Sequence, residues 1–355
     1  KQLVVEARTE FYIKKFRPEI KENWVVVYDG TTYEITRVDE FKNGEYTRIL
    51  ALRRDNFAPE LLLNNPVFML DTHSGATVAF SVRRLNTLYT GPCMRVRRTS
   101  DQEETDIGFT TAGDLDTELL ETFCSGTDGH VKTWYDQSGN GYDATQTTVA
   151  YQPIIVTSGV IKRNSDNEIC VFFEYADSFF DFTPVLDTAP HTAFVLTERI
   201  PGSQLEGYED RRGVYGFGSQ ADEPFLQSLN FDFNFWETYL GYAFIGNGIQ
   251  RTAVNSHTDL SNEPRLFTNR YDGSTYNLHV GSMEKREFSI AHTSSGRLSL
   301  AHRNSSEINI SEFVLYTSYV QDSTREAIET NINDYYGLWS LFDGGLLDTH
   351  TGPVM

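Results

Sequence analysis

The stretch Ile310-Ser311-Glu312-Phe313-Val314-Leu315-Tyr316 is typical of a β-strand, and strands of this kind decide the fold class. Similar short runs lie at 192–197, 276–280 and 298–301, and clusters of Gly, Asn, Asp and Ser separate them. Many short strands with turn signals between them are typical of antiparallel sandwiches. We therefore predict an all-β chain with a two-sheet antiparallel sandwich over residues 67–340.

Two helices are expected beside these strands. Leucines and a phenylalanine at helical spacing predict a helix over 116–123. Near the C-terminus, Ser323 and Glu326 form a capping box, in which each side chain can satisfy a backbone amide at the helix start. The terminal helix that follows carries an apolar stripe, which we expect to pack on the core: Ile328, Ile332, Tyr335 and Tyr336.

The first 56 residues show a different pattern. Alternating apolar residues at 24–28, 32–38 and 46–52 predict half-buried strands. Asp29-Gly30 and Asn43-Gly44 stand between these strands, and both pairs favour tight hairpin turns. This pattern predicts a small β-barrel, or part of one, over residues 1–56. Residues 57–66 contain two prolines and are expected to be a linker.

The charge is unevenly distributed along the chain. Residues 1–56 hold 11 Lys and Arg against 10 Asp and Glu, whereas the remainder holds 19 against 40. An acidic surface repels nucleic acid and anionic membranes. No stretch of about 20 apolar residues is present, which a membrane-spanning helix would need. We therefore expect neither direct nucleic-acid recognition nor a membrane partner.

The cysteines do not form a metal-binding or catalytic pattern. Cys93, Cys124 and Cys170 lie far apart and lack the CxxC or Cys/His spacing of a zinc site. An odd number of cysteines favours a protein that folds in a reducing cytoplasm, although one disulfide between two of them stays open. No cofactor is expected, apart from the calcium ion considered below.

One phrase occurs twice. Leu70-Asp71-Thr72-His73-Ser74-Gly75 opens the sandwich, and five of its six residues return at 347–352. Recurrence of a domain-opening phrase is typical of modular proteins. We expect residues 341–355 to be a linker to a second copy of the sandwich.

The N-terminal strands resemble a known family. Residues 7–20, which include Arg17-Pro18, and the following Asp29-Gly30 hairpin with Tyr33-Glu34-Ile35 resemble the second half of the phage head–tail adaptor (head-closure or stopper) family. The resemblance implies a homo-oligomeric ring in the neck of a tailed bacteriophage. It also implies a virion location, assembly in the host bacterial cytoplasm, and phage neck, portal and tail proteins as partners.

The sandwich resembles a second family. Its most specific motif is Trp134-Tyr135-Asp136-Gln137-Ser138-Gly139-Asn140-Gly141, and further matching stretches lie at 80–85, 95–101 and 105–109. These residues resemble the catalytic domain of α-L-arabinofuranosidase B, which implies a concanavalin-A-like jelly roll. Segments at 271–278 and 310–336 resemble laminin-G-like lectin modules of phage structural proteins.

The resemblance raises the question of catalysis. A retaining glycosidase needs two carboxyl groups about 5 Å apart. The family's acid/base is an aspartate before Asn-Ser, whereas Arg303 holds that place here, and arginine cannot exchange a proton at neutral pH. The family's adjacent cysteine pair and its nucleophilic glutamate before Asn-Gly have no counterpart. We therefore predict no catalytic residues. Other acidic residues are expected to be solvated: Glu206, Glu209, Asp210 and Asp232.

The 134–143 segment is the candidate binding site. Aromatic faces and side-chain amides lie close together there, as sugars require, in Trp134, Tyr135, Asp136, Gln137, Asn140 and Tyr142. Asp136, Asn140 and Asp143 could also supply oxygen ligands to Ca²⁺. The alternative is structural: Trp134 ends a buried strand, and residues 136–141 form a turn held by its own side chains.

These expectations combine into one prediction of function. The chain is expected to be a structural virion protein, in which the adaptor segment anchors a catalytically inactive, lectin-like sandwich that decorates the particle or holds host-surface polysaccharide. Many copies around a ring would supply avidity. The alternative is an α-L-arabinofuranosidase-like glycoside hydrolase that acts on arabinose-containing polysaccharide.

Overall fold

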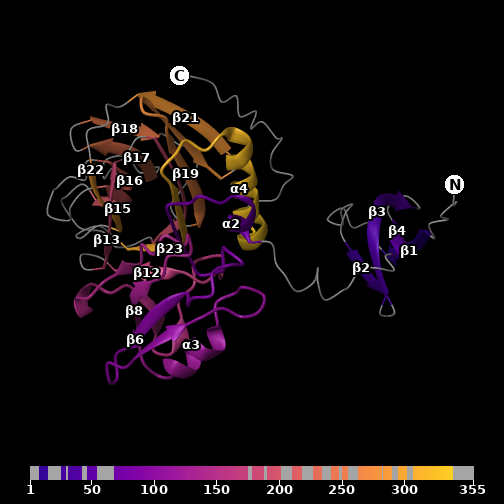
Figure 1. Ribbon diagram of the computed structural model, residues 1–355, viewed down its shortest axis with the longest axis horizontal. Helices are drawn as coiled ribbons and strands as arrows, with labels where there is room; N and C mark the ends of the chain where they lie inside the picture. The colour runs from indigo at the N-terminus through magenta and orange to yellow at the C-terminus, as the bar shows by residue number, and fades with distance from the viewer. Residues whose placement is uncertain are drawn as a thin grey trace, which may run out of the picture. The chain divides into compact units, whose positions relative to one another are not determined.

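A computed structural model describes residues 8–14, 25–28, 31–41, 46–53, 68–174, 178–187, 190–200, 210–217, 227–233, 241–247, 250–254, 263–281, 283–289, 295–301 and 307–338 (Figure 1). The chain divides into two compact units, Lys1–Pro66 and Val67–Met355, which are described separately. The predicted linkers at 57–66 and 341–355 lie outside the described residues.

The first unit contains a four-stranded antiparallel sheet in the order β1-β4-β3-β2. Its strands are β1 (Arg8–Lys14), β2 (Val25–Tyr28), β3 (Thr31–Phe41) and β4 (Tyr46–Arg53). Asp29-Gly30 joins β2 to β3, so the predicted hairpin is confirmed. Since β1 and β2 are the end strands, the described strands form an open sheet, and the β-barrel or part of one over residues 1–56 stays a prediction.

The second unit contains two larger sheets. In its described part, the larger sheet comprises β5 (Val78–Ser81), β6 (Met94–Arg98), β7 (Glu104–Ile107), β8 (Gly129–Trp134), β9 (Ala144–Thr145), β10 (Ile154–Thr157), β11 (Val160–Ile161), β12 (Val171–Phe173), β14 (His191–Arg199), β19 (Arg265–Tyr271), β20 (Thr275–Val280), β21 (Met283–Ser289) and β23 (Ile308–Tyr316). The smaller sheet comprises β13 (Phe180–Asp187), β15 (Asp210–Phe217), β16 (Gln227–Phe233), β17 (Gly241–Asn247), β18 (Gln250–Val254) and β22 (Ser295–Leu300).

Strand β23 is central to the larger sheet. It pairs with β14, β12 and β5, and all nine of its residues are buried. Its odd-numbered Phe313 packs toward the smaller sheet, where the Tyr215 ring centroid lies 5.2 Å away. The side chains of Asn269 and Tyr215 also meet across the sheets, since Asn269 Nδ2 donates to the Tyr215 hydroxyl at 2.8 Å. Successive strand residues face opposite sides, so Glu312 faces away from this interface.

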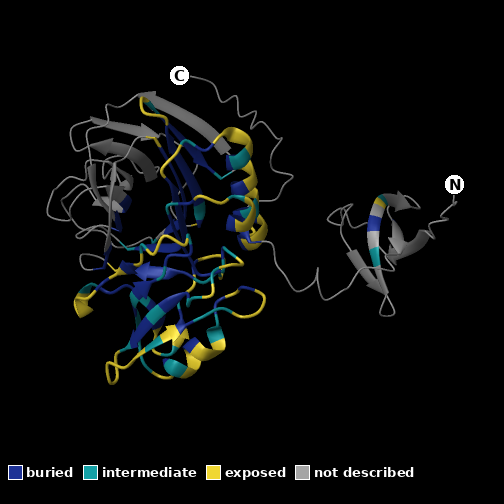
Figure 2. Cartoon of the chain, viewed as in Figure 1, coloured by how far each residue is buried: buried dark blue, intermediate teal, exposed yellow. Residues whose placement is uncertain are grey.

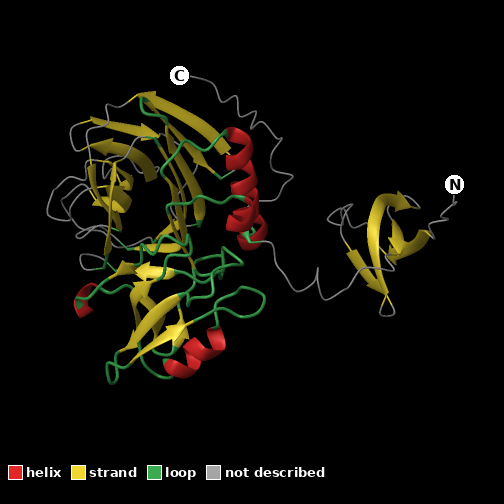
Figure 3. Cartoon of the chain, in the orientation of Figure 1, coloured by secondary structure: helices red, strands yellow, loops and turns green. Residues whose placement is uncertain are grey.

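Three α-helices are present in the described residues, and strands dominate the second unit (Figure 3). The short α2 (Met69–Thr72) opens the sandwich, and α3 (Thr117–Phe123) begins where Asp116 accepts a hydrogen bond from the Leu119 amide at 3.0 Å. This confirms the predicted helix over 116–123. The predicted antiparallel, sandwich-like fold is also confirmed, because every strand pairing among the described residues is antiparallel.

Helix α4 (Asp322–Tyr336) covers the outer face of the larger sheet beside β19 (Figure 1). It starts earlier than predicted, because Gln321 is the N-cap and Ser323 already lies inside the helix. Ile328 and Ile332 are fully buried, whereas Tyr335 is 39% exposed. Figure 2 shows this contrast along α4, whose sheet-facing side is buried and whose outer side is exposed.

No helix in the part of the chain that the structure describes is both long enough and apolar enough to cross a membrane.

Candidate functional site

The segment singled out by sequence, residues 134–143, connects β8 to β9. Trp134, at the end of β8, is fully buried, and its indole Nε1 donates to the Ser81 carbonyl at 3.3 Å. Its ring lies 6.0 Å from that of Phe80, centroid to centroid. Trp134 is therefore part of the sandwich core and has no face available to a sugar.

Asp136 organises the turn that follows. Its Oδ1 accepts hydrogen bonds from the amides of Ala79 and Ser138, both at 2.9 Å. Its Oδ2 accepts from the Ser138 hydroxyl at 2.7 Å and from the Tyr142 amide at 3.0 Å. Four donors thus surround a carboxylate that is only 3% exposed. A carboxylate enclosed by N–H and O–H donors stabilises the turn and presents no free oxygen to Ca²⁺.

The other proposed calcium ligands do not gather around Asp136. Asn140 turns its amide nitrogen to the carbonyls of Ala76 and Thr77, at 3.1 and 3.0 Å. Asp143 accepts a hydrogen bond from the Asp136 amide at 2.9 Å. Among the described residues, no group of three or more His, Cys, Asp or Glu side chains could hold a metal ion. The contacts of Asp136, Asn140 and Asp143 are those of a self-supporting turn.

The role of Asp136 can be measured through stability. We expect Asp136→Asn to lower the free energy of unfolding by about 2–3 kcal/mol, because the new amide nitrogen would face existing donors. Asp143→Asn is the matched control, since Asp143 is exposed and accepts one hydrogen bond of the same turn. We expect its cost to be about 1 kcal/mol or less. Urea unfolding would contradict this account if the two variants lost equal stability.

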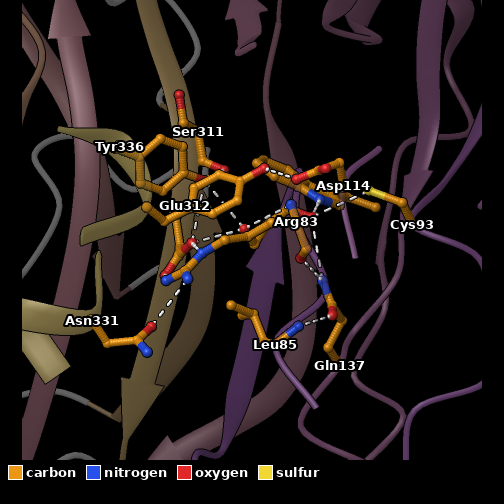
Figure 4. A network of polar contacts seen from close by, with 12 residues as sticks. Arg83, Leu85, Cys93, Asp114, Gln137, Ser311, Glu312, Asn331 and Tyr336 are labelled. Carbon is orange, nitrogen blue, oxygen red and sulfur yellow. Dashed lines mark hydrogen bonds and ion pairs between the residues drawn. The ribbon is translucent and has the colours of Figure 1, made fainter. Parts of the chain in front are cut away.

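Gln137 belongs to a polar network behind the turn (Figure 4). It is fully buried, its Oε1 accepts from the Leu85 amide at 2.7 Å, and its Nε2 donates to the Arg83 carbonyl at 2.9 Å. Both ends of the amide are therefore occupied by backbone groups. Gln137 holds the 83–85 segment in place and is not accessible to a glycan.

The centre of this network is a buried ion pair. Arg83 Nε and Nη2 donate to the two carboxylate oxygens of Glu312, at 2.8 and 3.0 Å (Figure 4). The two side chains are 7% and 1% exposed. The hydroxyls of Ser81 and Tyr336 also donate to Glu312 Oε2, at 2.8 and 3.2 Å. Burial alone would lower the pKa of Arg83, but the adjacent Glu312 carboxylate raises it above the ordinary value.

The ion pair ties together distant parts of the sequence. Glu312 lies on β23, Arg83 follows β5, and Tyr336 ends α4. Arg83 Nη1 also donates to Asn331 of α4 at 3.0 Å, and the guanidinium carbon lies 4.8 Å from the centroid of the Tyr335 ring. Nothing in the local sequence around Arg83 signals a partner more than 200 residues away, so sequence analysis missed this pair.

Part of the predicted segment does reach the surface. Tyr135 is half-buried, and its hydroxyl donates to Asp106 Oδ1 at 2.9 Å. Burial, followed by this hydrogen bond, raises the pKa of Tyr135 to about 12. Arg95 forms a bidentate pair with the same carboxylate at 2.8 Å, which lowers the pKa of Asp106. Tyr142 is also half-buried and packs partly on the core.

The three cysteines are all free and buried. Burial raises the pKa of Cys124 to about 11, and it raises the pKa of Cys93 and Cys170 further. The thiolate is the reactive form of cysteine. These side chains are therefore protected from reagents both because they are buried and because they stay protonated. We expect no reaction with Ellman's reagent at pH 8 in the folded protein and three thiols per chain after denaturation. A thiol that reacts rapidly in the folded protein would contradict this arrangement.

Several residues considered in the sequence analysis for a role in catalysis lie outside the described residues. They are Glu206, Glu209 and Arg303. Asp210 starts β15 and Asp232 lies in the adjacent β16, but their side chains are not described. The backbone register pairs Asp210 with Phe233 and Arg211 with Asp232. The two aspartates are therefore not register partners, and their positions alternate to opposite faces of the sheet.

Comparison with known proteins finds similarity to α-L-arabinofuranosidases in both sequence and fold. The family model for the catalytic domain of α-L-arabinofuranosidase B matches residues 71–168. An α-L-arabinofuranosidase B from Emericella nidulans (strain FGSC A4 / ATCC 38163 / CBS 112.46 / NRRL 194 / M139) is 40% identical over 67 residues, which are 19% of this chain and 13% of that protein. The alignment thus spans a small part of the curated relative.

The fold is similar to that of solved arabinofuranosidases. A GH54 α-L-arabinofuranosidase soaked with a cyclic sulfate inhibitor has a TM-score of 0.55 at 15% identity, covering 74% of this chain and 64% of that chain. An arabinofuranosidase complexed with arabinofuranosyl-α-1,2-xylobiose has a TM-score of 0.56 at 16% identity, with the same coverage. The chain spans less than two thirds of either structure. At this identity the likeness shows a shared fold.

These findings correct the predicted function. The prediction of a catalytically inactive virion protein is wrong, because the matching family model describes a catalytic domain and the similar structures are arabinofuranosidases. The predictions of a virion location and of a neck, adaptor and lectin role are wrong as well. The curated match is an Emericella nidulans enzyme and not a virion component. Nothing found supports the resemblance to head–tail adaptors.

The physical reasons for the errors are clear. An Asp-Gly turn occurs in many antiparallel hairpins, and the pairing of β2 with β3 accounts for the one at Asp29-Gly30. Arg17-Pro18 lies outside the described residues. The argument for lost chemistry depended on placing Arg303 in a loosely aligned part of the sequence. That residue lies outside the described residues, and the family match covers a different part of the chain.

Proposed function

We propose that the second unit is a glycoside hydrolase domain of the α-L-arabinofuranosidase type, acting on arabinose-containing polysaccharide. The observation that carries the proposal is the match of residues 71–168 to the catalytic-domain model. The two-sheet fold, shared with solved arabinofuranosidases at a TM-score of 0.55, supports it. We assign the sandwich to the concanavalin-A-like jelly-roll class as part of the same proposal.

The matched segment contributes to this function as a scaffold. Asp136 and Gln137 are enclosed by backbone groups, and the Arg83–Glu312 pair is buried beneath α4. None of these polar groups can exchange protons with a substrate while its hydrogen bonds are made. Tyr135, Asn140 and Tyr142 are the members of the predicted glycan-binding set that lie at or near the surface, and we propose them as polysaccharide contacts.

The chemistry requires two carboxyl groups elsewhere. In a retaining mechanism, one carboxylate attacks the anomeric carbon while the other protonates the leaving oxygen and then activates water. We propose that these groups come from the segment around β15 and β16, which holds Glu206, Glu209, Asp210 and Asp232. Asp210 and Asp232 occupy positions on opposite faces of the sheet, so neither is expected to be the partner of the other in this pair.

A chromogenic substrate tests the proposal. We expect the purified chain to release 4-nitrophenol from 4-nitrophenyl α-L-arabinofuranoside, the compound with which a GH54 α-L-arabinofuranosidase mutant has been soaked. The 4-nitrophenyl β-D-xylopyranoside and β-D-glucopyranoside are controls for specificity. Equal hydrolysis of all three compounds, or of none between pH 4 and pH 8, would contradict an arabinofuranosidase.

A further inference from the structure

The interface between α4 and the outer face of β19 and β20 is unusually polar. Arg270 of β19 and Asn277 of β20 are register partners, and Arg325 and Glu329 come from α4. All four residues are more than nine-tenths buried, with exposures of 0%, 4%, 8% and 6% in that order. Two guanidinium groups, an amide and a carboxylate therefore lie between a helix and a sheet, where apolar packing is the rule.

Many hydrogen bonds of these groups are made within the protein. Arg270 Nη1 donates to the Val320 carbonyl at 3.0 Å, and its Nη2 contacts Asp322 Oδ1 at 2.7 Å and His279 Nε2 at 3.1 Å. Arg325 pairs with Glu329 one turn along α4 and with Glu326 at 2.8 Å. The charges of the cluster are thus largely paired.

Four atoms of the same residues make no hydrogen bond: Arg270 Nε, Arg325 Nε, Asn277 Oδ1 and Glu329 Oε1. Of these, Arg325 Nε lies 3.7 Å from Asp322 Oδ1, within ion-pair range but beyond hydrogen-bonding distance. The hydroxyl of Thr268 is a fifth buried atom without a hydrogen bond of normal geometry, although it lies close enough to Glu329 to favour the charged form of that carboxyl group. The described part of the chain holds eight such buried atoms, so this one interface accounts for most of them. An unsatisfied buried polar atom costs about 1–3 kcal/mol, and folded proteins rarely tolerate several together.

The chemistry of these four atoms indicates which kind of molecule can supply their missing hydrogen bonds. The two arginine Nε–H groups are donors, and the oxygens of Asn277 and Glu329 are acceptors. An anion would face the carboxylates of Glu329 and Asp322, and a cation would face the guanidinium groups of Arg270 and Arg325. A small neutral molecule that both donates and accepts avoids both conflicts, and water has these properties.

We propose that this interface is an internal hydration site, in which ordered water molecules bridge α4 to β19 and β20. The waters accept from Arg270 Nε and Arg325 Nε and donate to Asn277 Oδ1 and Glu329 Oε1. The site lies next to the surface at Asp322, whose side chain is 70% exposed above Arg270, so exchange with bulk solvent needs only a small movement there.

Proton NMR on the ¹⁵N-labelled chain tests the proposal through the arginine Nε–H groups. We expect direct water cross-peaks, with the sign of a rotating-frame Overhauser effect, at Arg270 and Arg325. Arg83 and Arg97 are matched controls, because they are buried but their Nε groups donate to Glu312 and Gln152, at 2.8 and 2.7 Å. We expect no water cross-peak at either control.

Two outcomes would overturn the proposal. One is the absence of water cross-peaks at Arg270 or Arg325, and the other is peaks of equal intensity at all four arginines. A crystal structure of the chain supplies a second test that needs no variant. It should show ordered water within hydrogen-bonding distance of Arg270 Nε and Arg325 Nε, and a dry interface there would also overturn the proposal.

Discussion

Replacement of Glu312 by alanine is expected to lower the free energy of unfolding by about 3–5 kcal/mol, because it leaves the Arg83 guanidinium charged and unpaired in the core. Arg83 and Glu312 are 7% and 1% exposed, so water cannot replace the lost carboxylate without disrupting β23 and α4. The loss is measured by chemical denaturation followed by tryptophan fluorescence, to which the buried Trp134 of this unit contributes.

A double variant isolates the cause. Arg83→Met combined with Glu312→Leu removes both charges and keeps much of the side-chain volume. Buried ion pairs replaced by apolar residues often cost little, so we expect the double variant to be more stable than Glu312→Ala alone. A double variant that is less stable than the single one would show that packing, and not the unpaired charge, dominates.

The second large effect concerns catalysis. In the chromogenic assay, we expect two of the four amide variants Glu206→Gln, Glu209→Gln, Asp210→Asn and Asp232→Asn to lower kcat by about 10²–10⁴-fold, because proton transfer and nucleophilic attack both need a carboxyl group. The remaining two should keep activity close to that of the parent chain.

Glu118→Gln is the control for this series, since Glu118 is exposed on α3. It should leave kcat unchanged. If all four candidate variants retain the parent kcat, the catalytic carboxyl groups lie elsewhere in the chain, and our placement near β15 and β16 is wrong. Circular dichroism of each variant separates a lost fold from a lost reaction.

The strands were predictable because their signals are local. Alternation and turn residues located β2, β3 and β4, and the 310–316 run became the buried centre of the larger sheet. The start of α4 was placed too late, because a capping-box pattern at Ser323 and Glu326 is also compatible with the inside of a helix. Hairpin signals located the strands of the first sheet, but they do not specify whether a sheet closes into a barrel, and the described strands form an open sheet.

The role of the residues in the candidate site was harder to predict, because tertiary contacts decide which of them are accessible to a ligand. Trp134 and Gln137 have the composition of a glycan site, yet both are fully buried. The alternative prediction, a turn held by its own side chains, could be made because three of the four hydrogen-bond donors to Asp136 belong to the same segment. The fourth donor, Ala79, is distant in sequence, as is the Arg83–Glu312 pair, and no local pattern reports such contacts.

The release of free L-arabinose from arabinoxylan by the purified chain, followed by chromatography, is the most direct test of the proposed hydrolase. We predict that arabinose accumulates with time in proportion to the concentration of the chain, while the xylan backbone stays intact. No arabinose above the buffer control between pH 4 and pH 8 would contradict the account.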